Sequence, residues 1–378
     1  MSLPIPRSYA PMEALQVGEL PLGEQWQYEP KWDGFRCLAF RDGDRVDLMS
    51  KAGKPLGRYF PDLVEALRAL DASRFVLDGE IVIPVGKLLS FDELLLRIHP
   101  AASRVRTLAA AHPAMLIVFD LLVDAEGESL VQEPLSARRE ALESFAREQL
   151  AGARAVRLSP ATTAERTVKR WYASVGSALD GVIAKRRDLP YRTGERTGMQ
   201  KLKQKRTADC VVGGFRYASK GSSMGSLLLG LYDDEGLLDH VGFCSALSAA
   251  QRVELTPKLE VLVQKPGFTG QAPGGPSRWS TKRTSEWEPL ATKLVVEVEY
   301  DHFTGGRFRH GTGFLRWRPD KAPRQCTMAQ VEREASSSLL LLGAATRSAT
   351  NRVAAARKSS MRSAAKTTTK KKSPSRKP

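Results

Sequence analysis

Residues 28–36, Tyr-Glu-Pro-Lys-Trp-Asp-Gly-Phe-Arg, place Lys31 just before an Asp-Gly pair and Arg36 just after it, between two apolar runs. An Asp-Gly pair in that setting predicts a two-residue hairpin loop, because both loop positions favour positive φ. With Asp33 and Gly34 as the loop, Lys31 faces Arg36 across the strands. Like charges directly opposite each other are destabilising, so the pair favours a bound anion between them. The alternative is an exposed hairpin with two solvated bases.

This arrangement also bears on the reactivity of Lys31. A neighbouring guanidinium lowers the pKa of an ammonium group and leaves more neutral amine to act as a nucleophile. We therefore expect Arg36 to lower the pKa of Lys31, and Lys31 is the candidate nucleophile.

The stretch resembles the adenylation motif, Lys-x-Asp-Gly, of the covalent nucleotidyltransferases, which are DNA ligases, RNA ligases and mRNA capping enzymes. A motif of four residues recurs by chance. The resemblance therefore depends on further segments, which follow in the family's order as far as residue 321. The first is Ser50-Lys51-Ala52-Gly53, where Lys51 stands in place of the arginine that many members have.

Residues 75–83, Phe-Val-Leu-Asp-Gly-Glu-Ile-Val-Ile, alternate as a strand does and put Asp78 and Glu80 on one face. Two adjacent carboxylates repel each other unless a metal or sugar hydroxyls satisfy them. A plain hairpin turn at Asp78 and Gly79 is the alternative. The segment resembles the family's Asp-Gly-Glu motif, which implies that Glu80 contacts the ribose or a metal.

Two buried-strand segments carry further candidates. In residues 115–122 the resemblance implies that Phe119 stacks on adenine, and a plain core position is the alternative. Residues 180–185 resemble the motif Glu-Gly-x-x-x-Lys, with Asp180 in place of the usual Glu. This implies a metal-facing Asp180, set in the loop that enters the strand, and a phosphate-facing Lys185.

Basic residues complete the set. Lys201 and Lys203 share one face of a strand and resemble the family's Lys-x-Lys motif, although a solvated edge strand is the alternative. Arg318 and Lys321 lie in a segment that resembles the terminal motif, which orients the departing pyrophosphate. The resemblance also implies that Glu29 contacts the adenine edge.

The chain has 378 residues and a net charge of +16, and from residue 343 onward it carries eleven Lys or Arg and no Asp or Glu. Such a tail is expected to be disordered and to bind a polyanion, or else to act as a solubilising segment. The four cysteines are far apart in the sequence and lack the spacing of zinc ligands. We interpret them as reduced residues of a cytosolic protein. Neither a secretory signal nor a membrane-spanning run is expected.

The pattern predicts an α+β protein. A nucleotidyltransferase domain at 1–207 is followed by an OB-fold barrel at 208–328, a linker at 329–342 and a disordered basic tail at 343–378. In the first domain the expected strands are 25–31, 35–40, 45–49, 75–84, 115–122, 181–185 and 199–203, and the helices 60–70, 91–111, 135–150 and 164–179. In the barrel the expected strands are 209–215, 227–232, 240–243, 294–303 and 314–317, and the expected helix is 249–263.

The compact layout looks like the small bacterial ATP-dependent DNA ligases of the C type. The resemblance implies nick sealing through a lysine–AMP intermediate with ATP and Mg²⁺ (or Mn²⁺), in DNA repair. It also implies a cytoplasmic, nucleoid-associated monomer acting on nicked double-stranded DNA, with end-binding or polymerase repair proteins as further partners. An RNA ligase or capping enzyme would share these motifs, and a non-catalytic DNA-binding protein is the alternative from another class.

Overall fold

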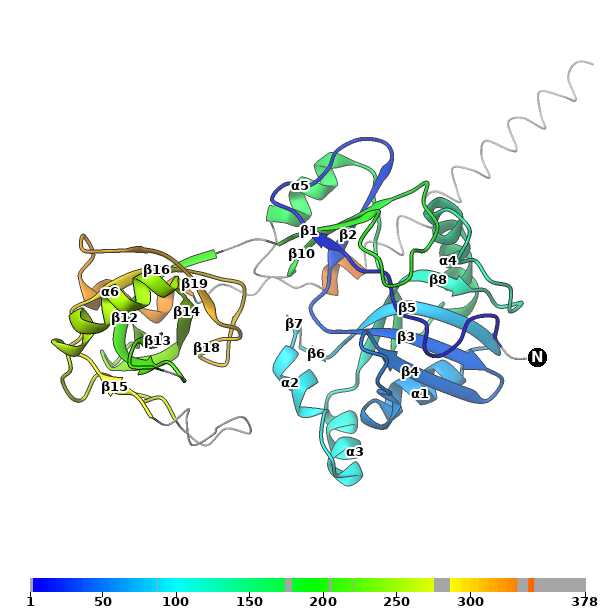
Figure 1. Ribbon diagram of the computed structural model, residues 1–378. Helices are drawn as coiled ribbons and strands as arrows, with labels where there is room; N and C mark the ends of the chain where they lie inside the picture. Colours follow the sequence, from blue (N-terminus) through cyan, green and yellow to red (C-terminus); the bar gives the residue numbers. More distant parts are fainter. Residues whose placement is uncertain are drawn as a thin grey trace, which may run out of the picture. The chain divides into compact units, whose positions relative to one another are not determined.

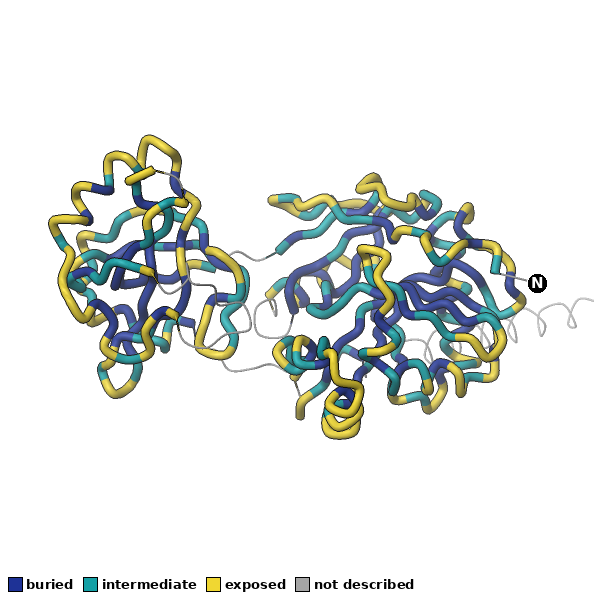
Figure 2. Tube along the Cα trace, turned by 60° about the horizontal axis from the view of Figure 1, so that its bottom comes forward, coloured by how far each residue is buried: buried dark blue, intermediate teal, exposed yellow. Residues whose placement is uncertain are grey.

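The computed structural model describes residues 3–86, 88–173, 179–203, 206–219, 221–274, 286–331 and 339–342. The chain divides into two compact units. Unit 1 contains residues 3–202 together with 339–342, and unit 2 contains the residues between (Figure 1). In each unit the buried residues gather on the central strands (Figure 2). Within the described ranges, no helix is long and apolar enough to cross a membrane.

The larger sheet of unit 1 has the strand order β4-β3-β5-β8-β9. It is antiparallel except for the last pair. Strand β8 is buried along almost its whole length, because it is central and both of its faces are covered. The strands are β3 (Phe35–Asp42), β4 (Arg45–Ser50), β5 (Arg74–Val82), β8 (Met115–Val123) and β9 (Val156–Leu158).

Helices α1 and α4 cover one face of this sheet, where Leu63, Leu142 and Phe145 pack into the same apolar cluster as Phe75 and Leu77 (Figure 1). Their apolar residues recur every three or four positions and so fall on one side of each helix. The helices of unit 1 are α1 (Pro61–Arg68), α2 (Phe91–Leu96), α3 (Ala102–Ala111), α4 (Leu135–Gln149) and α5 (Glu165–Ala173), with the 3₁₀ turn η1 (Gly57–Tyr59).

The single helix predicted for 91–111 is wrong, because the chain forms α2 and α3 with a break between them. Pro100 lies in the break; it has no N–H to donate, and it disfavours the helical conformation of the residue before it. The predicted helix start is confirmed, since the Ser90 hydroxyl accepts a hydrogen bond from the backbone N–H of Glu93 at 3.2 Å.

The second sheet of unit 1 has the order β1-β11-β10-β2 and shares apolar clusters with the first sheet. Its strands are β1 (Leu15–Gln16), β2 (Trp26–Lys31), β10 (Gly181–Arg186) and β11 (Met199–Lys203). A separate short pair joins β6 (Pro84–Val85) and β7 (Leu88–Leu89). The seven strands predicted for unit 1 agree with the observed bounds to within two residues, whereas β1, β6, β7 and β9 were not predicted.

The predicted hairpin at Asp33 and Gly34 is wrong. Strand β2 pairs with β10, whereas β3 pairs with β4 and β5, so residues 32–34 carry the chain from one sheet to the other. Neither Asp33 nor Gly34 has a positive φ. The glycine is needed for another reason, because a Cβ at position 34 would overlap the backbone oxygen of Ile81.

Unit 2 is a barrel of five strands that closes in the order β12-β13-β14-β19-β16 and back to β12. The only parallel pair in that ring is β14 with β19, and α6 lies between β14 and β16 in the chain. This is the predicted OB arrangement. The elements are β12 (Arg206–Tyr217), β13 (Met224–Tyr232), β14 (Leu238–Ala246), α6 (Ala249–Glu260), β15 (Glu288–Pro289), β16 (Val295–Tyr300), β17 (Phe303–Thr304), β18 (Arg307–Phe308), β19 (Thr312–Trp317), η3 (Pro323–Gln325) and η4 (Met328–Gln330).

Residues 339–342 return to unit 1. Leu342 is 3% exposed within the cluster formed by Trp26, Trp32 and Trp171, and Leu339 and Leu341 pack against the same cluster. The linker predicted for 329–342 is therefore wrong for these four residues. The predicted disordered tail, 343–378, lies outside the described residues.

Candidate active site

The pairing of β2 with β10 brings Lys31 to Asp180. Lys31 ends β2 opposite Gly181, and the backbone N–H of Asp180 donates to the carbonyl of Lys31 at 3.1 Å. The Lys31 ammonium forms an ion pair with the Asp180 carboxylate, whose side chain is 4% exposed. Asp180 lies in the loop that enters β10, as predicted.

The sequence predicted a positive charge, that of Arg36, beside Lys31, but the charges that act on its pKa most strongly are carboxylates. Burial disfavours the ammonium, but the carboxylates of Asp180 and Glu80 outweigh it, so the pKa of Lys31 is raised rather than lowered. The prediction of a lowered pKa for Lys31 is therefore wrong. It assumed a hairpin that would place Arg36 opposite Lys31, and the chain instead crosses between sheets here.

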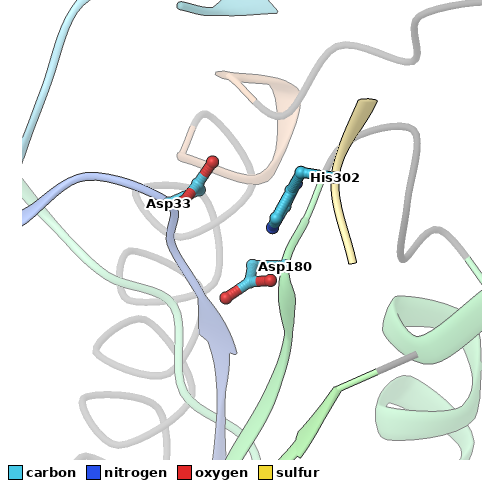
Figure 3. A group of neighbouring side chains, drawn as sticks. All are labelled: Asp33, Asp180 and His302. Atoms are coloured by element: carbon cyan, nitrogen blue, oxygen red, sulfur yellow. The ribbon is translucent and has the colours of Figure 1, made fainter. Parts of the chain in front are cut away.

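A second carboxylate stands beside Asp180. The carboxylate oxygens of Asp33 and Asp180 come within 4.8 Å of each other (Figure 3). His302, drawn in the same figure, belongs to unit 2. Glu80, the other predicted metal ligand, is not in this group. Hard carboxylate oxygens suit Mg²⁺, so the donor type fits the implied metal. Asp33 was missed because its Asp-Gly pair suggested a turn.

Arg36 is held by Asp78. The guanidinium donates two hydrogen bonds to this fully buried carboxylate, at 2.5 and 2.6 Å. Asp78 and Glu80 share the face of β5 opposite the apolar residues, as predicted. The charge of Asp78, however, is already paired with Arg36. Burial raises the pKa of Glu80 to about 7, against the attraction of Lys31 and Arg36.

Phe119 lies close to two cations. Its ring centroid is 4.6 Å from Cζ of Arg36 and 4.5 Å from Nζ of Lys185. Nζ of Lys185 also donates to Glu29 at 2.8 Å, and both of these charged side chains are buried. Buried charges of this kind persist when they are paired, so the pair holds Glu29 and Lys185 in fixed positions.

Most of these side chains line one pocket of about 190 Å³ between the two sheets of unit 1, although Asp33, Asp78 and Asp180 are not in its lining. Both sheets and the segment around Met12 contribute to its walls. Its lining includes eight of the predicted site residues: Glu29, Lys31, Arg36, Lys51, Glu80, Phe119, Lys185 and Lys201.

Four predicted site residues do not line this pocket: Asp180, Lys203, Arg318 and Lys321. Lys203 ends β11 outside the lining. Arg318 and Lys321 belong to unit 2, where both pair with Asp209, at 2.8 and 3.0 Å. Lys51 lines the pocket but is ion-paired with Glu13 at 2.9 Å.

Comparison with known proteins agrees with both units. Residues 16–203 match the family described as the ATP dependent DNA ligase domain, and residues 220–321 match the ATP dependent DNA ligase C terminal region.

Individual relatives agree with this assignment. DNA ligase C2 of Mycolicibacterium smegmatis is 45% identical over 349 residues, which cover 88% of this chain and 96% of that protein. The multifunctional non-homologous end joining protein LigD of Pseudomonas aeruginosa is 30% identical, over 86% of this chain and 37% of that protein. A Lig E DNA ligase of known structure shares the fold, with a TM-score of 0.50 at 16% identity, over 82% of this chain and 99% of that one. The chain therefore belongs to the ATP-dependent DNA ligases, enzymes that seal nicks in DNA.

Proposed function

We propose that the pocket of unit 1 forms the lysine–AMP intermediate of this ligase on Lys31. Nζ of Lys31 attacks the α-phosphorus of ATP, an N–P bond forms, the bond to the β-phosphate oxygen breaks, and pyrophosphate leaves. AMP then passes to the 5′-phosphate of the nick, and the 3′-hydroxyl displaces it. The observation that carries this proposal is that Lys31 shares one pocket with seven of the ten other predicted nucleotide-binding residues.

Attack requires a neutral amine, and the raised pKa of Lys31 sets a condition for it. The amine loses its proton to solvent once Asp180 is engaged elsewhere. Asp33 and Asp180 would hold the metal, and Mg²⁺ (or Mn²⁺) bound there would offset the carboxylate charge and that of the phosphates. In-line geometry and neutralised phosphate oxygens then matter more than acid–base catalysis.

The other residues bind the nucleotide in this proposal. Phe119 stacks on the adenine and Glu29 accepts from its amino edge, for which Lys185 must give up part of its pairing with Glu29. Glu80 contacts the ribose hydroxyls. The phosphate-binding side chains are Arg36, Lys51, Lys185, Lys201 and Lys203, joined by Arg318 and Lys321 for the departing pyrophosphate.

Labelling with α-labelled ATP tests the nucleophile. Wild-type protein is expected to become labelled, and Lys31→Ala is expected to stay unlabelled, with mass spectrometry placing AMP on residue 31. Label on the alanine variant would refute the assignment. Parallel reactions with GTP, NAD and an RNA nick separate DNA ligation by ATP from the capping and RNA-ligase alternatives.

We infer that the substrate is nicked double-stranded DNA, sealed during repair by a monomer in the cytoplasm at the nucleoid. The end-joining name of the LigD relative supports the repair role, with end-binding or polymerase proteins as partners. The eleven basic residues from 343 on would add affinity for DNA by counterion release. Deleting 343–378 is expected to lower the affinity for nicked DNA and flatten its salt dependence while sparing self-adenylation. An unchanged salt slope would remove the tail from this role.

A further inference from the structure

Tyr191 lies outside every segment that the nucleotidyltransferase resemblance identified. It is 4% exposed, and its hydroxyl joins two parts of unit 1 that are far apart in sequence. The hydroxyl donates to Oδ2 of Asp78 at 2.6 Å and accepts from the backbone N–H of Met12 at 2.9 Å. Burial beside Asp78 raises the pKa of Tyr191, so the hydroxyl keeps the proton that it donates.

The contacts form a closed ring. Asp78 holds Arg36 through two hydrogen bonds, and Nη2 of Arg36 also reaches the carbonyl oxygen of Met12 at 3.4 Å. Both backbone groups of Met12 are therefore bonded, one to Tyr191 and one to Arg36. Of the four members, Met12 and Arg36 line the nucleotide pocket. The ring therefore sets the distance between the wall at Met12 and the guanidinium of Arg36.

The phenol ring of Tyr191 extends this support toward Phe119. The guanidinium of Arg138 lies 5.5 Å from the ring centroid of Tyr191 and makes two hydrogen bonds to Asp120, at 2.8 and 3.0 Å. Asp120 directly follows Phe119, the residue that stacks on adenine in the proposed function. Tyr191 thus connects Met12, Arg36 and the backbone beside Phe119 through buried polar groups, and such networks hold their members rigidly when fully satisfied.

We propose that Tyr191 is a positioning residue for ATP: its hydroxyl fixes the Met12 wall and Arg36 at the spacing that the nucleotide requires. The N–H of Met12 is taken up by Tyr191, so it is not available as a donor to the nucleotide. The inference rests on the proposed function of the pocket. Tyr191 itself does not touch the nucleotide and takes no part in the chemical step.

The variant Tyr191→Phe removes only the hydroxyl. It leaves the Met12 N–H buried without its partner and Asp78 with one hydrogen bond fewer, and the pocket wall is expected to shift. A buried group left unpaired costs enough to change an equilibrium by roughly tenfold or more. The expected result is a rise of about tenfold in KM for ATP in self-adenylation, with a much smaller change in the rate at saturating ATP.

Tyr28→Phe is the matched control. Tyr28 is also a buried tyrosine of unit 1, 1% exposed, and its hydroxyl makes one hydrogen bond, to the carbonyl of Pro21 at 2.8 Å. The melting temperature of both variants reports the general cost of losing a buried hydroxyl. We expect both to melt below wild type and only Tyr191→Phe to change KM for ATP.

A double variant with Asp78→Asn tests whether the two residues act as a unit. Coupled residues give effects that do not add, so Tyr191→Phe is expected to change KM for ATP little further once Asp78 is replaced. The inference is overturned if Tyr191→Phe keeps the wild-type KM for ATP, or if the control raises it equally. Failure of the proposed function looks different, because wild-type protein would then form no AMP adduct at all.

Discussion

Replacing Glu80 by Gln is expected to stabilise unit 1 in a manner that depends on pH. The folded protein raises the pKa of Glu80 to about 7 from its ordinary value of 4.5, mainly by burial. Below about pH 4.5 the carboxyl group is protonated in the folded and unfolded states alike, so it does not change the free energy of unfolding. As the pH rises through 7 the unfolded chain ionises first, so the folded protein loses stability. Above pH 7 the loss is complete and amounts to about 3 kcal/mol.

Gln keeps the shape of the side chain and cannot ionise. Glu80→Gln should therefore unfold with a free energy about 3 kcal/mol higher than wild type near pH 8.5, and less than about 1 kcal/mol higher near pH 5. The same variant should form the AMP adduct more slowly, because a neutral amide accepts hydrogen bonds from the ribose hydroxyls more weakly than a carboxylate. A protein more stable and less active is the pattern expected of a strained functional site.

Urea unfolding measured at four pH values between about 5 and 8.5 checks this prediction. Glu140→Gln, on the exposed side of α4, is the matched control and should show no such trend. If Glu80→Gln gives a difference that does not grow with pH, the carboxyl group is not destabilised by burial. Full adenylation activity in that variant would also remove Glu80 from the nucleotide site.

Two further predictions concern Lys31 and residues 339–342, which pack on unit 1. Removing the carboxylate by Asp180→Asn should lower the pKa of Lys31, so its amine should react with an acylating reagent at lower pH than in wild type; an unchanged pH profile would mean that the ion pair does not govern the amine. Leu342→Ala should destabilise unit 1 by about 2–5 kcal/mol in thermal or urea unfolding, because it leaves a cavity. Leu340→Ala, at a side chain that is 74% exposed, should cost almost nothing, and equal losses would contradict the packing.

The sequence predicted those elements whose pattern is local. Alternating apolar residues in β5 correctly put Asp78 and Glu80 on one face. Glycine-separated short strands with one helix correctly indicated the barrel of unit 2, because an OB fold has a fixed order of elements. The order of the family's segments brought eight predicted residues to one pocket.

The predictions that failed depended on partners distant in sequence. Asp33 and Gly34 have the chemistry of a hairpin loop, but β2 and β3 each find a better partner in another strand, β10 or β5. The pKa of Lys31 followed that error, since Asp180 approaches only through the pairing with β10. Tyr191 and Met12 gave no signal, because a buried tyrosine and a backbone N–H meet only in the folded chain.

The return of residues 339–342 makes the barrel an insertion between two parts of unit 1 instead of an appendage at its end. A shortened protein that stops where the barrel begins would leave Trp26, Trp32 and Trp171 without the leucine that covers them. Such a fragment is expected to aggregate for a reason unrelated to catalysis. An engineered minimal nucleotidyltransferase should therefore splice these four residues back through a short flexible linker.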